Sequence, residues 1–227
     1  TYVTTMAYAM EEAAKYGITF YVLDRPNPIT GRIVEGPVLD ESNRSFVGYF
    51  PMPVRHGMTV GELALMFNAE RKIGADLRVI RMKGWERDLW FDETSLPWIN
   101  PSPNIRTLGQ ALLYPGIALL ESLTNYSVGR GTGTPFLFVG ADWIDTELLL
   151  KRLRQAELPG VTFYSVQRTP SKDFFAGKTI LGIQLSILNR EALYSTRIGL
   201  EIASTLYELH PDRVDLNRTV GLIGDRE

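Results

Sequence analysis

Cysteine is absent from this chain of 227 residues, and histidine occurs only twice. Without cysteine the chain forms no disulfide bonds, and thiolate catalysis and cysteine-ligated zinc are excluded. The sequence also lacks any apolar run of about 18 residues, the length that a transmembrane helix needs. No membrane span is therefore predicted.

Neither sign of charge is in large excess. The 24 lysine and arginine residues and the 26 aspartate and glutamate residues give a formal net charge of −2. That balance indicates neither a nucleic-acid partner nor binding to anionic lipid. The hydrophobic fraction of 44% and the charged fraction of 22% are typical of a globular protein. The length suggests one large or two small domains.

The start of the chain has the pattern of the interior of an α/β domain. Thr1–Met6 contains no initiator methionine and no signal-peptide pattern. Residues 4–16 predict a helix that Gly17 ends. Residues 18–23 predict a nearly all-apolar strand, buried on both faces as in parallel sheets. The partner strands of this unit would lie upstream or later in the chain. Because the sequence starts without methionine and in mid-domain, we expect a processed or trimmed N-terminus.

Later segments predict more helices and strands. Thr59 and Glu62 have the spacing of a capping box and predict the start of a helix. The proline and glycine at 115 and 116 predict the end of another helix. In order, the sequence predicts a helix over 60–68, a half-buried strand over 76–82, a helix over 107–113, a helix after residue 143, strands over 161–166 and 179–187, and a helix over 191–207.

A glycine-rich loop at residues 125–136 is the clearest candidate for a site. Arg130 lies between two glycines, and its guanidinium suits a carboxylate, a phosphate or a carbonyl. The loop matches neither the P-loop pattern nor the dinucleotide-binding pattern. One interpretation is a tight connection that needs glycine for its geometry. The other is a loop that binds a polar ligand, with Asn125, Arg130 and Thr132 as contacts.

The loop after the first predicted strand is a second candidate. Asp24, Arg25 and Asn27 follow the carboxyl end of that strand, where open α/β sheets bind ligands. An Asp–Arg pair that organises a turn is the alternative. We expect this turn and Arg130 to line one shared pocket.

Residues 29–60 are rich in glycine and proline and predict a long irregular segment, which is often functional. The segment contains Glu35 and leads to His56. His56 is either part of a functional site or an ordinary surface or hydrogen-bonded residue. Trp85, Trp90 and Trp98 lie nearby, either as core residues or as the lining of a carbohydrate cleft.

A set of motifs along nearly the whole chain resembles the NamZ-type exo-β-N-acetylmuramidases, long catalogued as a bacterial domain of unknown function. The motifs carry the resemblance through their order, although each is short. They are Leu23-Asp-Arg-Pro-Asn-Pro28, Glu35-Gly-Pro-Val-Leu-Asp40, Pro53-Val-Arg-His-Gly-Met-Thr-Val-Gly-Glu-Leu-Ala64, Leu96-Pro-Trp98, Pro101-Ser-Pro-Asn104, Tyr114-Pro-Gly116, Thr124-Asn125, Gly129-Arg-Gly-Thr132 and Pro135-Phe136.

The resemblance implies a peptidoglycan-recycling glycosidase that releases N-acetylmuramic acid from muramyl oligosaccharides. It implies no cofactor, an extracellular or periplasmic location and a monomer or homodimer. The fold class it implies is α/β, with part of a Rossmann-like domain over residues 1–103 and an α+β domain over residues 104–227. A non-catalytic module that binds cell-wall glycan or protein is the alternative, and a nucleotide-binding enzyme that uses the glycine-rich loop is a third.

The resemblance also bears on the residues of the site. Relatives carry an upstream Pro-Glu-His-Gly signature, which this sequence lacks, and a final helix beyond its last residues, so we predict that this chain is inactive alone. Glycosidases usually need two carboxyl groups, and Arg130 is expected to bind the lactyl carboxylate of muramic acid. The catalytic candidates are Glu35, Glu121 and Asp24; the substrate-binding candidates are Arg25, Asn27, His56, Asn104, Asn125, Arg130 and Thr132.

Overall fold

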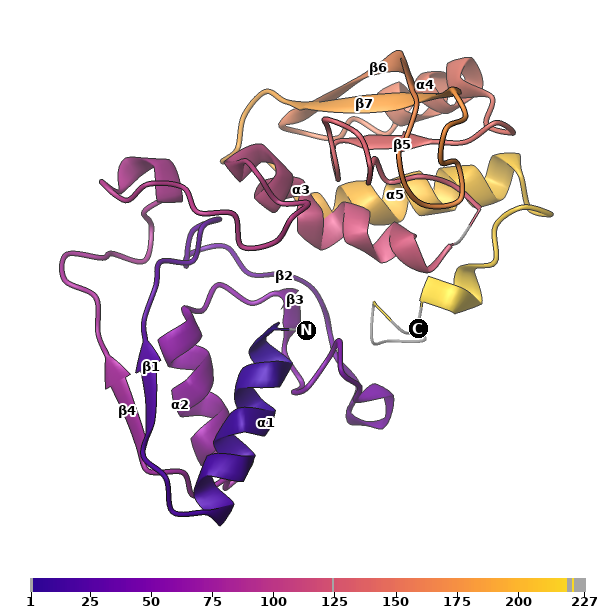
Figure 1. Cartoon of the computed structure of the whole chain (residues 1–227). Coiled ribbons are helices and arrows are strands. Elements are labelled where there is room, and N and C mark those ends of the chain that lie inside the picture. The colour runs from indigo at the N-terminus through magenta and orange to yellow at the C-terminus, as the bar shows by residue number, and fades with distance from the viewer. Residues whose placement is uncertain (1, 124, 220–221, 223–227) are drawn as a thin grey trace. The chain divides into compact units, whose positions relative to one another are not determined.

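The computed structural model describes residues 2–123, 125–219 and 222. Its contacts divide the chain into two compact units, Thr1–Leu96 and Pro97–Arg226 (Figure 1). The mixed α/β content predicted from the sequence is confirmed. The predicted domain boundary after residue 103 stays a prediction.

The first unit contains a parallel pair of strands with two helices packed against it. Strands β1 (Phe20–Leu23) and β4 (Leu77–Ile80) pair so that Phe20 lies opposite Leu77. Helices α1 (Tyr2–Lys15) and α2 (Val60–Glu70) lie side by side next to this pair in Figure 1. Their contact with the strands forms a small apolar core of Met10, Val22, Ala64 and Ala75.

The expectation that the first strand is buried on both faces is wrong. Val22 is 6% exposed, whereas its neighbours Tyr21 and Leu23 are 63% and 71% exposed. Alternate side chains of a strand point to opposite faces, so the helices cover one face of β1 and leave the other bare. Only this parallel pair represents a Rossmann-like sheet within the described residues of the first unit, and the Rossmann-like assignment stays a prediction.

The segment expected to be irregular contains two strands. β2 (Glu35–Val38) and β3 (Pro53–Arg55) form an antiparallel pair with a register shift. The short 3-10 helix η1 (Glu41–Asn43) lies between them. Because β2 contains Gly36 and Pro37, which strands rarely contain, its sequence shows no strand pattern.

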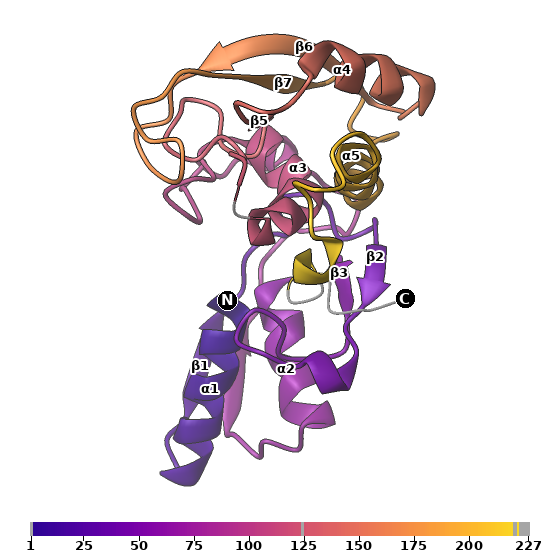
Figure 2. The same ribbon diagram turned by 90° about the vertical axis from the view of Figure 1, so that its right-hand side faces the viewer.

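The second unit is built on an antiparallel sheet of three strands in the order β5 (Phe138–Gly140), β7 (Ile180–Ile187) and β6 (Val161–Arg168). Both views of the chain place two helices on the same side of this sheet (Figure 2). They are α3 (Leu108–Ile117) and α5 (Ser195–Leu209). Further helical elements of the second unit are α4 (Thr146–Gln155), η3 (Ala118–Ser122) and η4 (Leu216–Thr219). The short helix η2 (Phe91–Glu93) lies at the end of the first unit.

The predicted helix break at residues 114–116 is wrong. Helix α3 continues through Pro115 to Ile117, although proline lacks the N–H of a helical hydrogen bond. The last turn of α3 packs against α5 so closely that a Cβ on Gly116 would lie 1.7 Å from the carbonyl oxygen of Ser195. This tertiary packing stabilises a helical turn that the local sequence disfavours.

Local start signals for the helices are confirmed. Thr59 and Glu62 form a complete capping box at the start of α2. Thr107 and Gln110 form another at the start of α3. In the described part of the chain, no helix has the length and apolar character needed to cross a membrane.

Candidate functional site

The glycine-rich loop takes a backbone path that requires glycine at two positions. Gly129 and Gly131 have φ angles of 82° and 74°, which side chains disfavour. A Cβ on Gly129 would lie 2.5 Å from the carbonyl oxygen of Thr134, and one on Gly131 would lie 2.6 Å from the nitrogen of Lys172. The geometric interpretation of these glycines is therefore confirmed.

Arg130 is already paired within this loop. Its Nε and Nη2 atoms donate to the two carboxylate oxygens of Glu121, and the Nη2–Oε2 distance is 2.9 Å. The guanidinium also lies over the ring of Phe136, 5.1 Å from its centroid. Hydrogen bonding to Glu121 raises the pKa of Arg130. Arg130 is therefore charged but locally neutralised.

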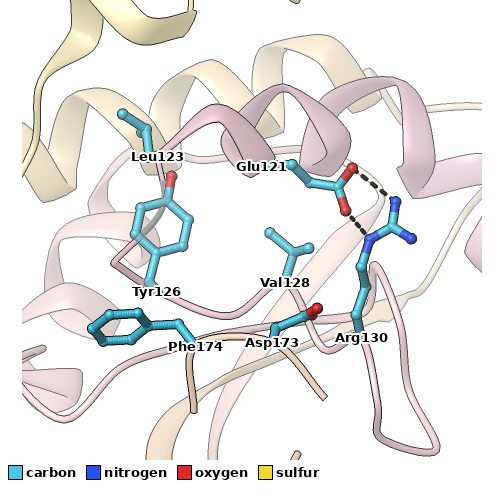
Figure 3. Close-up of a pocket in the computed structure, with 7 residues that line it drawn as sticks. All are labelled: Glu121, Leu123, Tyr126, Val128, Arg130, Asp173 and Phe174. Carbon is cyan, nitrogen blue, oxygen red and sulfur yellow. Dashed lines mark hydrogen bonds and ion pairs between the residues drawn. The ribbon is translucent and has the colours of Figure 1, made fainter. Parts of the chain in front are cut away.

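A hollow of about 520 Å³ opens beside this ion pair (Figure 3). Glu121 and Arg130 face each other along one side, and Asp173 and Phe174 lie on the loop opposite Glu121. Apolar side chains form most of the remaining wall. The lining residues are Glu121, Leu123, Tyr126, Val128, Arg130, Asp173 and Phe174.

The charges of the hollow disfavour an anionic ligand. Among the described residues, its lining carries the carboxylates of Glu121 and Asp173 and one guanidinium, that of Arg130. A ligand carboxylate at Arg130 would have to compete with Glu121 for the same donors. The hollow therefore suits neutral polar groups, such as sugar hydroxyls, better than an acid.

Asp173 was not predicted from the sequence. It has a φ angle of 70°, which Asp and Asn adopt more readily than most residues. The backbone N–H of Ser171, two residues earlier, donates to the carbonyl oxygen of Gly131 at 2.9 Å and ties the two loops together. Because that contact is between distant segments, only the turn-forming residues around Asp173 could have pointed to it.

The other candidates of this unit hold the loop or lie near it. Thr132 donates its hydroxyl to the carbonyl oxygen of Gly129 at 2.6 Å and accepts the N–H of Thr134 at 3.0 Å. Asn125 donates its side-chain amide to the carbonyl oxygen of Arg213. Asn104 is partly buried on the segment before α3.

In the first unit, Asp24 caps a helix. One carboxylate oxygen accepts the N–H groups of Arg25 and Gly61 at 2.9 and 2.8 Å. The other accepts the hydroxyl of Thr59 at 3.0 Å. A carboxylate at the start of α2 also interacts favourably with the helix dipole. Three hydrogen bonds therefore give Asp24 a complete structural role.

Glu35 and Asn27 are likewise engaged in the structure. Glu35 accepts a hydrogen bond from Nη1 of Arg55 at 2.6 Å, and the two side chains are 5% and 0% exposed. Asn27 is buried, donates to the carbonyl oxygen of Met58 at 3.1 Å and accepts the N–H of Ile29 at 3.1 Å. Both residues hold the long loop in place.

A second hollow, of about 350 Å³, lies at the carboxyl ends of β1 and β4. Asp24 and Trp85 contribute to its lining, together with Gly61 at the start of α2. Arg25 is exposed on the loop that leaves β1. This is the place where parallel sheets present ligand-binding groups, as the sequence predicted for Asp24.

The three tryptophans do not share one role. Trp90 is 1% exposed and belongs to the core, where the guanidinium of Arg55 lies 5.8 Å from its ring centroid. Of the two roles that the sequence left open for Trp90, the structure supports the core role. Trp85 lines the second hollow, and Trp98 is partly buried.

His56 is a buried hydrogen-bond acceptor. Its Nδ1 atom accepts the N–H of Met58 at 3.0 Å, which requires an unprotonated Nδ1. Burial lowers the pKa of His56 from its ordinary value of 6.5, and nearby Glu62 acts weakly in the opposite direction. His56 is therefore neutral at pH 7.

We expect His56 to make folding stability depend on pH in the acid range. Below its unfolded-state pKa of 6.5, the unfolded chain binds a proton that the folded chain resists. Stability should then fall as the pH drops from 6.5 toward the lowered folded-state pKa. Replacing His56→Asn keeps an acceptor and removes the titration, so urea denaturation between pH 7.5 and 5 should show a flatter dependence. Equal slopes in both proteins would contradict this assignment.

Solved structures share this fold. A DUF1343 family protein from Bacteroides fragilis NCTC 9343 matches with a TM-score of 0.91 and 35% identity, over 99% of this chain and 61% of its own. A second DUF1343 family protein from that organism matches with a TM-score of 0.76 and 32% identity, over 99% and 60%. The chain therefore has the fold of the DUF1343 class.

Sequence comparison identifies the family. Models described as exo-beta-N-acetylmuramidase NamZ, N-terminal and C-terminal, match residues 1–109 and 112–227. The peptidoglycan beta-N-acetylmuramidase NamZ of Bacillus subtilis (strain 168) is 46% identical over 212 residues, which are 93% of this chain and 51% of the relative. The chain belongs to the NamZ family, as its motifs indicated, and spans about half the length of that curated relative.

Proposed function

We propose that this chain is part of a glycoside hydrolase that releases N-acetylmuramic acid from peptidoglycan fragments. The observation that carries the proposal is the 46% identity to a peptidoglycan beta-N-acetylmuramidase along 93% of the chain. The hollow beside Glu121 and Arg130 supports it, because carboxylates next to apolar and aromatic surface suit a sugar ring.

Among the predicted catalytic carboxylates, Glu121 is the best placed to act on a ligand. Asp24 and Glu35 use their oxygens to cap α2 and to neutralise Arg55. Glu121 borders an open hollow, where a carboxylate could act on a ligand as a base or nucleophile, and it pairs with Arg130. Glycoside hydrolysis also needs a carboxyl group that acts as an acid. That group comes either from Asp173 or from the upstream segment that the family resemblance implies.

The proposal is tested with a chromogenic β-N-acetylmuraminide. We expect release of N-acetylmuramic acid by the protein that joins this sequence to the upstream family segment, and no turnover by the 227-residue chain alone. The matched β-N-acetylglucosaminide, which lacks only the lactyl ether, serves as the control substrate. A glycan-binding module without catalysis is the alternative, and it predicts binding without release in both proteins.

Turnover of the glucosaminide in preference to the muraminide would overturn the proposed substrate class. Turnover by the short chain would overturn the expectation that it is inactive alone. Assaying both substrates with both proteins tests the substrate class and the inactivity of the short chain separately.

A further inference from the structure

Two arginines other than Arg130 contact the turn at the end of the glycine-rich loop. Arg106, just before α3, donates from Nη2 to the carbonyl oxygen of Thr132 at 2.9 Å. Arg168, at the end of β6, donates from Nε to the hydroxyl of Thr134 at 3.4 Å. The Oγ1 atoms of these two threonines lie 3.5 Å apart. Two guanidinium groups are therefore held at one three-residue turn.

Neither of these arginines forms an ion pair with a carboxylate in the part of the chain that the structure describes. Arg106 is exposed, and the Thr132 contact uses one of the five N–H donors of its guanidinium. Among the described residues its remaining donors contact no acceptor, and the exposed side chain leaves them open to solvent. No carboxylate of the described residues neutralises the positive charge of Arg106, whereas Glu121 neutralises that of Arg130.

Arg168 is held in place by its neighbours. Its Nη2 atom donates to Oε1 of Gln184 at 3.0 Å, and its Nη1 atom donates to the carbonyl oxygen of Gln167 at 3.0 Å. Gln184 is 4% exposed and lies on the central strand β7, so it is a firm anchor. Together with the Thr134 contact, these bonds use three of the five N–H donors of the Arg168 guanidinium. Two N–H groups remain on a guanidinium whose orientation is already fixed.

Two places along the loop therefore have side chains of opposite net charge around them. At Arg130, two carboxylates line a hollow with one guanidinium. At the turn of residues 132–134, two guanidinium groups stand without a carboxylate among the described residues. A ligand carboxylate is therefore attracted to the turn of residues 132–134 and repelled by the hollow beside Arg130.

We propose that Arg106 and Arg168, and not Arg130, bind the carboxylate of an acidic amino sugar. The proposal rests on the proposed function, because N-acetylmuramic acid differs from N-acetylglucosamine by a lactyl ether that carries a carboxylate. A planar fork of donors binds a carboxylate through parallel hydrogen bonds. The two arginines select the acidic sugar, and the hollow beside Glu121 accepts its neutral parts.

The test is a binding experiment on the full 227-residue chain, which requires no hydrolysis. NMR titration with methyl β-N-acetylmuraminide and methyl β-N-acetylglucosaminide gives the preference for the acidic sugar, and the arginine Nε–H signals report where it binds. We expect a preference of about 10-fold or more in the unmodified chain, since hydrogen bonds to a charged group are strong. Arg106→Gln and Arg168→Gln should each reduce it about 10-fold, while Arg130→Gln should change it less than about 2-fold.

Three controls make the outcome decisive. The lactamide analogue of the muraminide keeps the shape without the charge and should bind like the glucosaminide. Added salt should weaken only the acidic ligand, because exposed charges are screened. Thermal unfolding checks that each variant folds; if Arg168→Gln does not, the exposed Arg106→Gln decides.

The proposal is overturned if the unmodified chain shows no preference, if both glutamine variants keep it, or if Arg130→Gln alone abolishes it. These results are distinct from failure of the proposed function. A chain that prefers the muraminide through Arg106 and Arg168, within a protein that never hydrolyses it, would support this inference and contradict the hydrolase.

Discussion

Glu35→Ala is expected to lower the free energy of unfolding by about 3–5 kcal/mol, the cost of removing one partner of a buried ion pair. Glu35 and Arg55 are joined at 2.6 Å with side chains 5% and 0% exposed. Without Glu35, the charge of Arg55 would remain buried, with a hydrogen bond to the carbonyl oxygen of Ile29 at 2.6 Å and the Trp90 ring nearby. Urea denaturation followed by circular dichroism measures the change.

The matched control is Glu41→Ala. Glu41 pairs with Arg71 at 2.7 Å, but its side chain is 52% exposed. Water can therefore replace most of the interactions that Arg71 loses with the carboxylate. We expect little change in unfolding free energy. If Glu35→Ala were as mild as Glu41→Ala, the Glu35–Arg55 pair would not be structural and Glu35 would again be a candidate for catalysis.

Gly116→Ala is expected to destabilise the second unit by about 3 kcal/mol, the upper end of the usual cost of overpacking. The added Cβ would lie 1.7 Å from the carbonyl oxygen of Ser195 and 2.5 Å from its carbonyl carbon. These are backbone atoms of α5, so no side chain can rotate away. Helices α3 and α5 would have to separate, which would disturb the core beneath the sheet. The change is read from the same urea denaturation.

Helix α3 also contains the control for this prediction. A Cβ on Gly109 would lie 3.7 Å from its nearest neighbour, the Cδ1 atom of Ile187, which is an ordinary contact. Gly109→Ala should therefore be neutral or stabilising by up to about 1 kcal/mol, since alanine favours helix more than glycine does. If Gly116→Ala and Gly109→Ala changed the free energy of unfolding equally, helix propensity, and not the α3–α5 contact, would determine the effect at Gly116.

The two units use their polar residues differently. In the first, Asp24, Asn27 and Glu35 use their hydrogen-bonding groups to hold a long loop and the start of α2. In the second, Glu121 borders an open hollow, and Arg106 has donors left for a ligand. Polar residues in the glycine- and proline-rich loop of the first unit therefore have structural roles, because such a loop has few ladder hydrogen bonds of its own. The shared pocket expected for Arg130 and the turn after β1 stays a prediction, as does export.

Features that depend on neighbours along the chain could be predicted from the amino-acid sequence. The capping box of α2, the start of α3 near residue 107, the need for glycine in the loop and the half-buried alternation of β4 were all predicted correctly. These features involve residues a few positions apart, whose preferred geometry is set by local sterics and hydrogen bonds. The ordered motifs also identified the NamZ family.

Tertiary structure alone decided the features that depend on distant partners. It determined which face of β1 is covered and why α3 continues through Pro115. It also determined that Arg130 pairs with a carboxylate, whereas Arg106 and Arg168 pair with none among the described residues. Burial and charge pairing depend on which segments meet in space, and the energies of those contacts are large enough to override local preference. Residue type told us that an arginine could bind an acid, and only the fold told us which arginine has donors free to do so.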